Sequence, residues 1–137
     1  MQKLKKIDAQ TNVLTWFEIP VVDIDRAKKF YEIILDIHMV KMGDGDNEGV
    51  FFPFNPAIVQ ATSGRVTGVL AKTAGNKPSG NGPVIYINAS PAIQAVLDRV
   101  ESAGGKVLQA KKKFGAVGFI ALILDSEGNK VGLHAEC

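Results

Sequence analysis

The stretch WFEIPVVDIDRAKKFYEIILDI, residues 16–37, carries the clearest indication of the fold. Its first half is an apolar run rich in β-branched and aromatic residues, which predicts a strand, but one carboxylate, Glu18, interrupts it. Asp23 then offers an N-cap, and the apolar residues that follow recur at the spacing of one helical face. The stretch therefore predicts a strand followed by an amphipathic helix, and it raises the question of why a charged side chain sits inside the strand.

The rest of the first half reads as three more strands. They are predicted near residues 39–42, 50–54 and 66–71, with a turn at 43–47 between the first two. Residues 73–82 are almost all turn formers and read as a linker.

The second half repeats the plan of the first. It begins with a strand at residues 83–89 and a helix with Ser90 as N-cap, and strands follow near 106–110, 119–124 and 130–135. Aligning the halves on Gly68 and Gly132 places Leu70 at the position of His134. We expect one α+β domain over residues 1–137, made of a βαβββ module at about 13–72, the linker, and a second module at about 83–136.

Strand alternation assigns a face to Glu18. Phe17, Ile19 and Val21 form a wholly apolar set that we expect beneath the helix, so Trp16 and Glu18 share the other face. A helix covers one face of each module, and two such sheets curving together form a mixed sheet with a concave cavity. Glu18 is therefore expected to face this cavity, either solvated or paired with a cation.

Composition narrows the classes of function. A hydrophobic content of 46% with 22% charged residues is typical of a soluble globular protein. No apolar run approaches the ~20 residues that a membrane span needs. The net charge is only +2, and the basic run Lys111–Lys113 has no aromatic residues between its lysines, so neither nucleic acid nor membrane is an expected partner. Cys137 is the only cysteine and no secretory signal is recognisable, which favours a cytoplasmic location.

Two short motifs carry a family resemblance. Asp23, Arg26, Phe30 and Tyr31 match a D-x-x-R/S-x-x-x-F-Y element, and the segment DSEGNKVGL, residues 125–133, matches D-x-x-G-N-x-x-x-L. With these motifs the chain resembles, from about residue 13 to residue 136, the vicinal oxygen chelate superfamily of glyoxalase I, bleomycin resistance proteins and extradiol dioxygenases. It is most similar to the small bacterial glyoxalase-like group. The resemblance implies paired βαβββ modules, a ligand or metal in the concave sheet, and a homodimer.

The same resemblance places four metal-ligand positions at Trp16, Gly68, Pro83 and Gly132. None of these side chains coordinates a divalent cation, so we expect no metal residue and no cofactor. A shift of two residues would instead offer Glu18 and His134, which are too few for a catalytic site, so a divalent metal is disfavoured.

The expected function is the binding of a small organic molecule in the concave cavity. We expect Trp16, Glu18, Phe52 and His134 to contact that ligand. Two alternatives stay open, and with them whether the chain is an enzyme. One is a metal-dependent glyoxalase-like lyase or dioxygenase, and the other is a metal-free enzyme in which Glu18 and His134 are the catalytic acid–base pair.

Overall fold

The computed structural model describes residues 6–43, 48–59 and 62–137, so most of the turn predicted at 43–47 lies outside the described residues. Within these ranges there are two helices and eight strands. The elements of the first module are β1 (Trp16–Pro20), α1 (Ile24–Leu35), β2 (Val40–Met42), β3 (Glu48–Phe51) and β4 (Thr67–Lys72). Those of the second are β5 (Tyr86–Asn88), α2 (Ile93–Val100), β6 (Lys106–Lys113), the 3-10 turn η2 (Gly115–Val117), β7 (Phe119–Leu124) and β8 (Lys130–Ala135).

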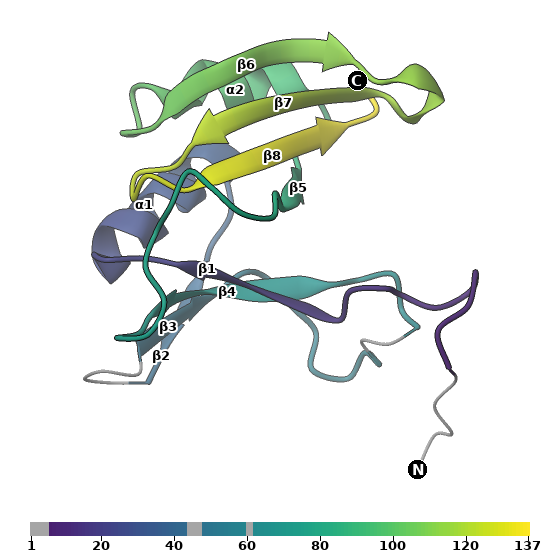
Figure 1. Ribbon diagram of the computed structural model, residues 1–137, viewed down its shortest axis with the longest axis horizontal. Helices are drawn as coiled ribbons and strands as arrows, with labels where there is room; N and C mark the ends of the chain where they lie inside the picture. Colours follow the sequence, from purple (N-terminus) through teal and green to yellow (C-terminus); the bar gives the residue numbers. More distant parts are fainter. Residues whose placement is uncertain (1–5, 44–47, 60–61) are drawn as a thin grey trace.

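The strands form two four-stranded mixed sheets with the same topology, one above the other in Figure 1. The strand order is β1-β4-β3-β2 in the first and β5-β8-β7-β6 in the second. In each sheet the first strand runs parallel to the last, and the other pairs are antiparallel. The predicted α+β fold with two tandem βαβββ modules is confirmed. No helix in the described ranges combines the length and the apolar character needed to cross a membrane.

Helix α1 begins and packs as its sequence predicts. The Asp23 carboxylate accepts a hydrogen bond from the Arg26 amide at 3.0 Å, which satisfies one of the free N–H groups of the first turn. The buried side of the helix is formed by Ile24, Ala27, Phe30, Tyr31 and Ile34.

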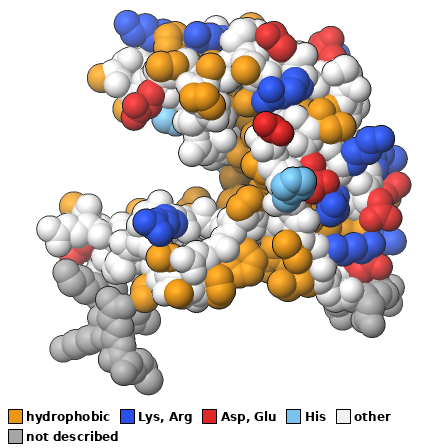
Figure 2. Space-filling view, turned by 180° about the vertical axis from the view of Figure 1, so that it is seen from behind, with side chains coloured by type: hydrophobic (Ala, Val, Ile, Leu, Met, Phe, Trp, Pro, Cys, Tyr) orange, Lys and Arg blue, Asp and Glu red, His pale blue; other side chains and the backbone are white. Residues whose placement is uncertain are grey.

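The two faces of β1 are those predicted. Ile19 and Val21 are buried, and Phe17 packs against the same core, beneath α1. Trp16 and Glu18 are exposed on the opposite face. Figure 2 shows the molecule as two lobes with a hollow between them.

Helix α2 begins at Ile93, so Ser90 is not its N-cap. The N-cap is Ala92, whose side chain makes no capping hydrogen bond, and the Ser90–Pro91 peptide before it is cis. The Ile93 amide donates instead to the Cys137 carbonyl oxygen at 3.0 Å. A tertiary contact thus satisfies a first-turn N–H that the sequence assigned to a side chain.

The alignment of the two halves predicted from the sequence differs by one residue from the one that the structure shows. The Val21 amide donates to the Ala71 carbonyl oxygen, and the Ala89 amide donates to that of His134 in the same position of the second sheet. Ala71, not Leu70, therefore corresponds to His134. The difference decides the face, because a slip of one residue moves a side chain to the other side of a sheet. Leu70 is fully buried under the first module's helix, whereas His134 lies on the open face.

The turn between β7 and β8 fastens the second module to the first. The Tyr31 hydroxyl donates to the buried Asp125 carboxylate at 2.8 Å. The Asn129 amide donates to the Pro20 carbonyl oxygen at 2.8 Å and accepts from the Ser79 amide of the linker at 3.1 Å. One hydrophobic core runs through both modules.

Candidate ligand pocket

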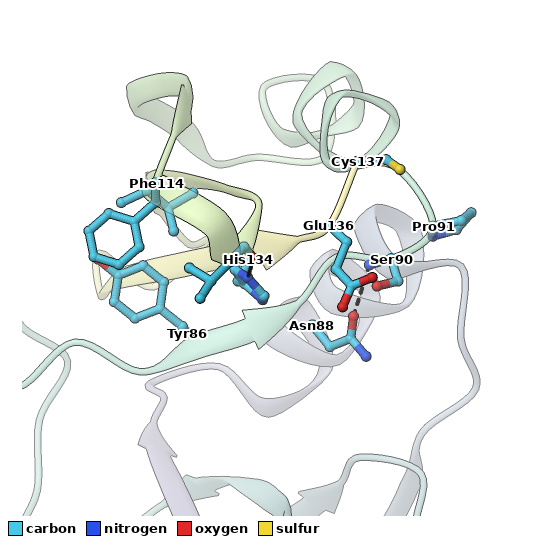
Figure 3. A pocket seen from close by; sticks show the side chains of 10 residues that line it. Tyr86, Asn88, Ser90, Pro91, Phe114, His134, Glu136 and Cys137 are labelled. Carbon is cyan, nitrogen blue, oxygen red and sulfur yellow. Dashed lines mark hydrogen bonds between the residues drawn. The ribbon is translucent and has the colours of Figure 1, made fainter.

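The open face of the second sheet carries a pocket of about 720 Å³, within the range of small-molecule sites. Its apolar lining comes from Tyr86, Pro91, Phe114, Val117 and Ile120, and its polar lining from Asn88, Ser90, His134, Glu136 and Cys137. Figure 3 shows Phe114 and Tyr86 at one end, Asn88, Ser90 and Glu136 at the other, and His134 between them. The pocket therefore has an apolar end and a polar end.

Strand register positions its floor. Asn88 on β5 pairs with His134 on β8, and His134 pairs with Ile120 on β7, so the three side chains stand in one row across the sheet. Tyr86 lies two residues before Asn88 and shares its face. The ring of Tyr86 covers Gly132, where an added Cβ would lie 2.4 Å from its Cδ1 atom. Gly132 is therefore needed for the ring to lie over β8.

His134 is held by the loop that joins β6 to β7. Its Nε2 atom lies 2.6 Å from the Val117 carbonyl oxygen. Since a carbonyl oxygen only accepts, Nε2 carries the hydrogen and donates it, and in the neutral imidazole Nδ1 is the acceptor. The Asn88 side-chain oxygen accepts from the Ser90 amide at 2.9 Å, which leaves its NH₂ group as the donor.

A second, smaller hollow of about 330 Å³ contains Glu18 and lies between β1, the linker and the β7–β8 turn. Lys77 and Lys130 also line it. Among the described residues no hydrogen bond or ion pair holds the Glu18 carboxylate, which is exposed to solvent. Of the two environments expected for Glu18, the structure shows the solvated one.

The structure separates the residues that the sequence grouped as a site. His134 lines the larger pocket and Glu18 the smaller hollow, so one chain does not bring them together as an acid–base pair. Trp16 lies on the open face of the first sheet, with its ring centroid 5.5 Å from that of Phe51.

The expectation that Phe52 lines the cavity is wrong. Its side chain is only 6% exposed, and its ring packs on Phe17 and Tyr31 in the core, at centroid distances of 5.4 and 5.5 Å. Its neighbour Phe51 takes the open face instead, because adjacent residues of a strand point to opposite sides.

Sequence reasoning missed most of the pocket lining. Tyr86 and Asn88 carried a usable signal, since they alternate with the buried Ile87 in a short strand. Phe114 and Val117 carried none, because they reach the pocket from a loop whose path depends on tertiary contacts.

The side chains present do not fit a divalent metal at the four positions that the family resemblance implies. Gly68 and Gly132 are both covered by aromatic rings: an added Cβ would lie 2.4 Å from Phe17 Cδ2 at the first and 2.4 Å from Tyr86 Cδ1 at the second. The side chains of Trp16 and Pro83 have no atom that coordinates a metal ion. In the described part of the chain no three His, Cys, Asp or Glu side chains gather closely enough to hold a metal ion.

Solved structures with this fold come from several organisms. A glyoxalase/bleomycin resistance protein from Albidiferax ferrireducens T118 has a TM-score of 0.64 and 22% identity, over 89% of this chain and 98% of that chain. A glyoxalase I variant from Zea mays has a TM-score of 0.63 and 21% identity, over 88% of this chain and 45% of that one. A variant of a fosfomycin resistance protein from Listeria monocytogenes, complexed with Mn(II) and dihydroxypropylphosphonic acid, has a TM-score of 0.60 and 14% identity, over 89% and 90% of the two chains. At these identities the likeness establishes the fold.

Sequence comparison gives the family. A search of curated proteins found no significant match. The profile described as "Glyoxalase/Bleomycin resistance protein/Dioxygenase superfamily" matches residues 13–133, which is nearly the whole chain and confirms the resemblance of the two motifs. The chain belongs to the glyoxalase/bleomycin resistance protein/dioxygenase superfamily.

Proposed function

We propose that this protein binds a small organic molecule in the pocket on the open face of the second sheet, without a divalent metal. The observation that carries the proposal is the pocket itself, about 720 Å³ in volume with an apolar and a polar end. Such a lining holds an apolar body by burial and orients it through a few polar contacts. The variant of the fosfomycin resistance protein from Listeria monocytogenes was solved with a small organic acid and Mn(II). Among the described residues of this chain no three His, Cys, Asp or Glu side chains gather to hold a metal ion, which supports binding without one.

The polar end narrows the class of ligand. Nδ1 of His134 and the Glu136 carboxylate are hydrogen-bond acceptors, and the Asn88 NH₂ group is a donor. No lysine or arginine is among the described residues that line the pocket. We therefore propose a ligand with a flat apolar body and an N–H or O–H donating head, either neutral or cationic, rather than an anion.

A matched pair of probes tests the pocket and its polarity. Phenethylamine and phenylacetate share a phenyl body and differ in the sign of the head group. Phenethylamine at 100 times its dissociation constant is expected to stabilise the wild type by about 2.7 kcal/mol in thermal denaturation. Phenylacetate at the same concentration is expected to stabilise it much less, and EDTA should leave the phenethylamine effect unchanged.

The variant Tyr86→Ala removes the aromatic wall and should abolish the phenethylamine effect. Leu108→Ala is the matched control, because Leu108 is an exposed apolar residue of β6 and does not line this pocket. Stabilisation that survives in Tyr86→Ala, or none in the wild type, would contradict the proposal. Stabilisation that EDTA removes would restore the metal-dependent alternative.

We also propose that the protein is a cytoplasmic homodimer. A reducing cytoplasm suits an exposed, unpaired Cys137 thiol. The dimer is supported by large apolar side chains that are exposed in the first module, among them Trp16, Val40, Met42 and Phe54.

A further inference from the structure

One hydrogen bond joins the rim of the pocket to its floor. Residues 114–118 connect β6 to β7, and Phe114 and Val117 of this loop line the pocket on the open face of the second sheet. There the Val117 carbonyl oxygen accepts the hydrogen bond from His134 Nε2 at 2.6 Å. His134 stands on β8, opposite Ile120 of β7, so the bond joins the loop to the centre of the sheet.

The loop is shaped to rest on the end of β8. The Phe114 amide donates to the Gly118 carbonyl oxygen at 2.8 Å and closes the loop on itself. Gly118 has φ +107°, a conformation that other residues avoid. An added Cβ there would lie 2.4 Å from the Ala135 carbonyl oxygen, so only a glycine allows the loop to approach β8 this closely.

The loop supplies apolar lining that packing alone holds weakly. Phe114 and Val117 both line the pocket, yet their side chains are 56% and 54% exposed. Because burial stabilises in proportion to the apolar area removed from water, side chains this exposed anchor the loop only a little. The hydrogen bond between His134 and the Val117 carbonyl oxygen therefore contributes strongly to the position of the Phe114 ring relative to Tyr86.

We propose that His134 is a positioning residue that fastens the 114–118 loop over the pocket and so sets the width of its apolar end. The inference rests on the proposed function and deepens it. Beyond the acceptor that its Nδ1 atom offers to the head group, His134 acts on the apolar body of the ligand through Phe114 and Val117, because its Nε2 hydrogen is committed to the loop. The position of the Phe114 ring relative to Tyr86 then decides which apolar bodies this end of the pocket accepts.

Amide hydrogen exchange of the ligand-free protein tests the fastening directly. In His134→Ala the Phe114 amide should exchange about tenfold faster, the effect of losing one hydrogen bond of ordinary net strength. In His134→Gln exchange should return close to the wild-type rate, because the glutamine side-chain amide also donates from a position near that of Nε2. His38→Ala is the matched control, since His38 follows α1 and does not line the pocket, and it should leave the rate unchanged.

Phenethylamine affinity gives the second readout. It should fall about tenfold in His134→Ala and recover in His134→Gln. Gly118→Ala displaces the loop without touching His134 and should raise the exchange rate of Phe114 in the same way, which covers the case that His134→Ala does not fold.

Two results would overturn the inference: an unchanged Phe114 exchange rate in His134→Ala, or no recovery in His134→Gln. A wild type that fails to bind phenethylamine counts against the proposed function alone, because the exchange is measured without ligand.

Discussion

Glu18 interrupts the apolar run of β1 because the strand is covered by a helix on one side only. Phe17 and Ile19 take the covered side, and the Glu18 carboxylate takes the open side, where water solvates it. Its position is thus explained by strand alternation, without a partner. The neighbouring hollow also contains two lysines, but the described residues form no ion pair with Glu18.

Two adjacent phenylalanines show how sharply the face of a strand decides the role of a residue. Phe52→Ala removes a ring from the core and should lower the free energy of unfolding by about 3–5 kcal/mol. Phe51→Ala removes a ring from the open face and should cost about 1 kcal/mol. Urea denaturation of both variants measures the difference, and equal losses would show that the two faces are assigned wrongly.

At the scale of elements, the β7–β8 turn caps the helix of the other module. The Glu127 side chain has no exposed surface and accepts from the Val22 and Asp23 amides at 2.9 and 2.7 Å and from Arg26 Nε at 2.6 Å. Burial by itself raises the pKa of Glu127. The hydrogen bonds from Arg26, Asp23, Val22 and Ser126 together outweigh burial and hold that pKa below its ordinary value of 4.5.

The lowered pKa of Glu127 predicts a pH-dependent contribution to stability. Because the folded pKa lies below 4.5, the ionised carboxylate stabilises the fold above that pH, and the contribution is lost as the pH falls through the folded pKa. Glu127→Gln replaces one accepting oxygen with an NH₂ group, which faces the Val22 and Asp23 amides and Arg26 and cannot accept their hydrogen bonds. This variant should lower the free energy of unfolding by about 1–3 kcal/mol at pH 7. The difference from the wild type should shrink below pH 4.5.

Urea denaturation at pH 7 and again at the lowest pH where the wild type stays folded measures this contribution. Glu101→Gln is the control, since Glu101 is exposed at the end of α2 and should change stability by no more than about 0.5 kcal/mol. A Glu127→Gln deficit that is the same at both pH values would contradict the assigned role.

At the scale of the whole molecule, the first module leaves an apolar surface uncovered. Trp16, Val40, Met42 and Phe54 are each between 41% and 55% exposed. Val40 and Met42 lie on β2, one of the two edge strands of the first sheet. Sheet edges and apolar faces of this kind invite association, and a second copy of the chain is the proposed occupant.

Met42→Glu places a charge in the proposed dimer interface and should weaken self-association at least about tenfold, or ~1.4 kcal/mol. Sedimentation equilibrium over a range of concentrations measures the effect. Ile33→Glu is the matched control, because Ile33 is similarly exposed, at 39%, but lies on α1. A monomeric wild type, or equal weakening in both variants, would contradict the dimer.

Much of the fold was predictable because its signals are local. The cap at Asp23, the buried faces of both helices and strands β7 and β8 all follow from spacing within one element. The start of α2 was not predictable in this way. Its first amide is satisfied by the Cys137 carbonyl oxygen, and no pattern near Ser90 records a partner so distant in sequence.

The candidate site shows the same division. Alternation correctly placed Trp16 and Glu18 on the open face of β1. Phe51 and Phe52 are adjacent and both apolar, so the pattern does not show which of them faces the core, and the prediction chose the wrong one for the open face. His134 was singled out by the sequence, but its donor role and its separation from Glu18 were not.

The family could be identified from sequence motifs, and the two βαβββ modules and the inner face of each helix could be predicted from periodicities within single elements. The register between the halves, the solvated state of Glu18 and the pocket beside the 114–118 loop became known from the three-dimensional arrangement alone. Each of these depends on hydrogen bonds and packing between segments far apart in sequence. Those contacts depend on the lengths of connections and the paths of loops, and the periodicity of the sequence predicts neither the lengths nor the paths.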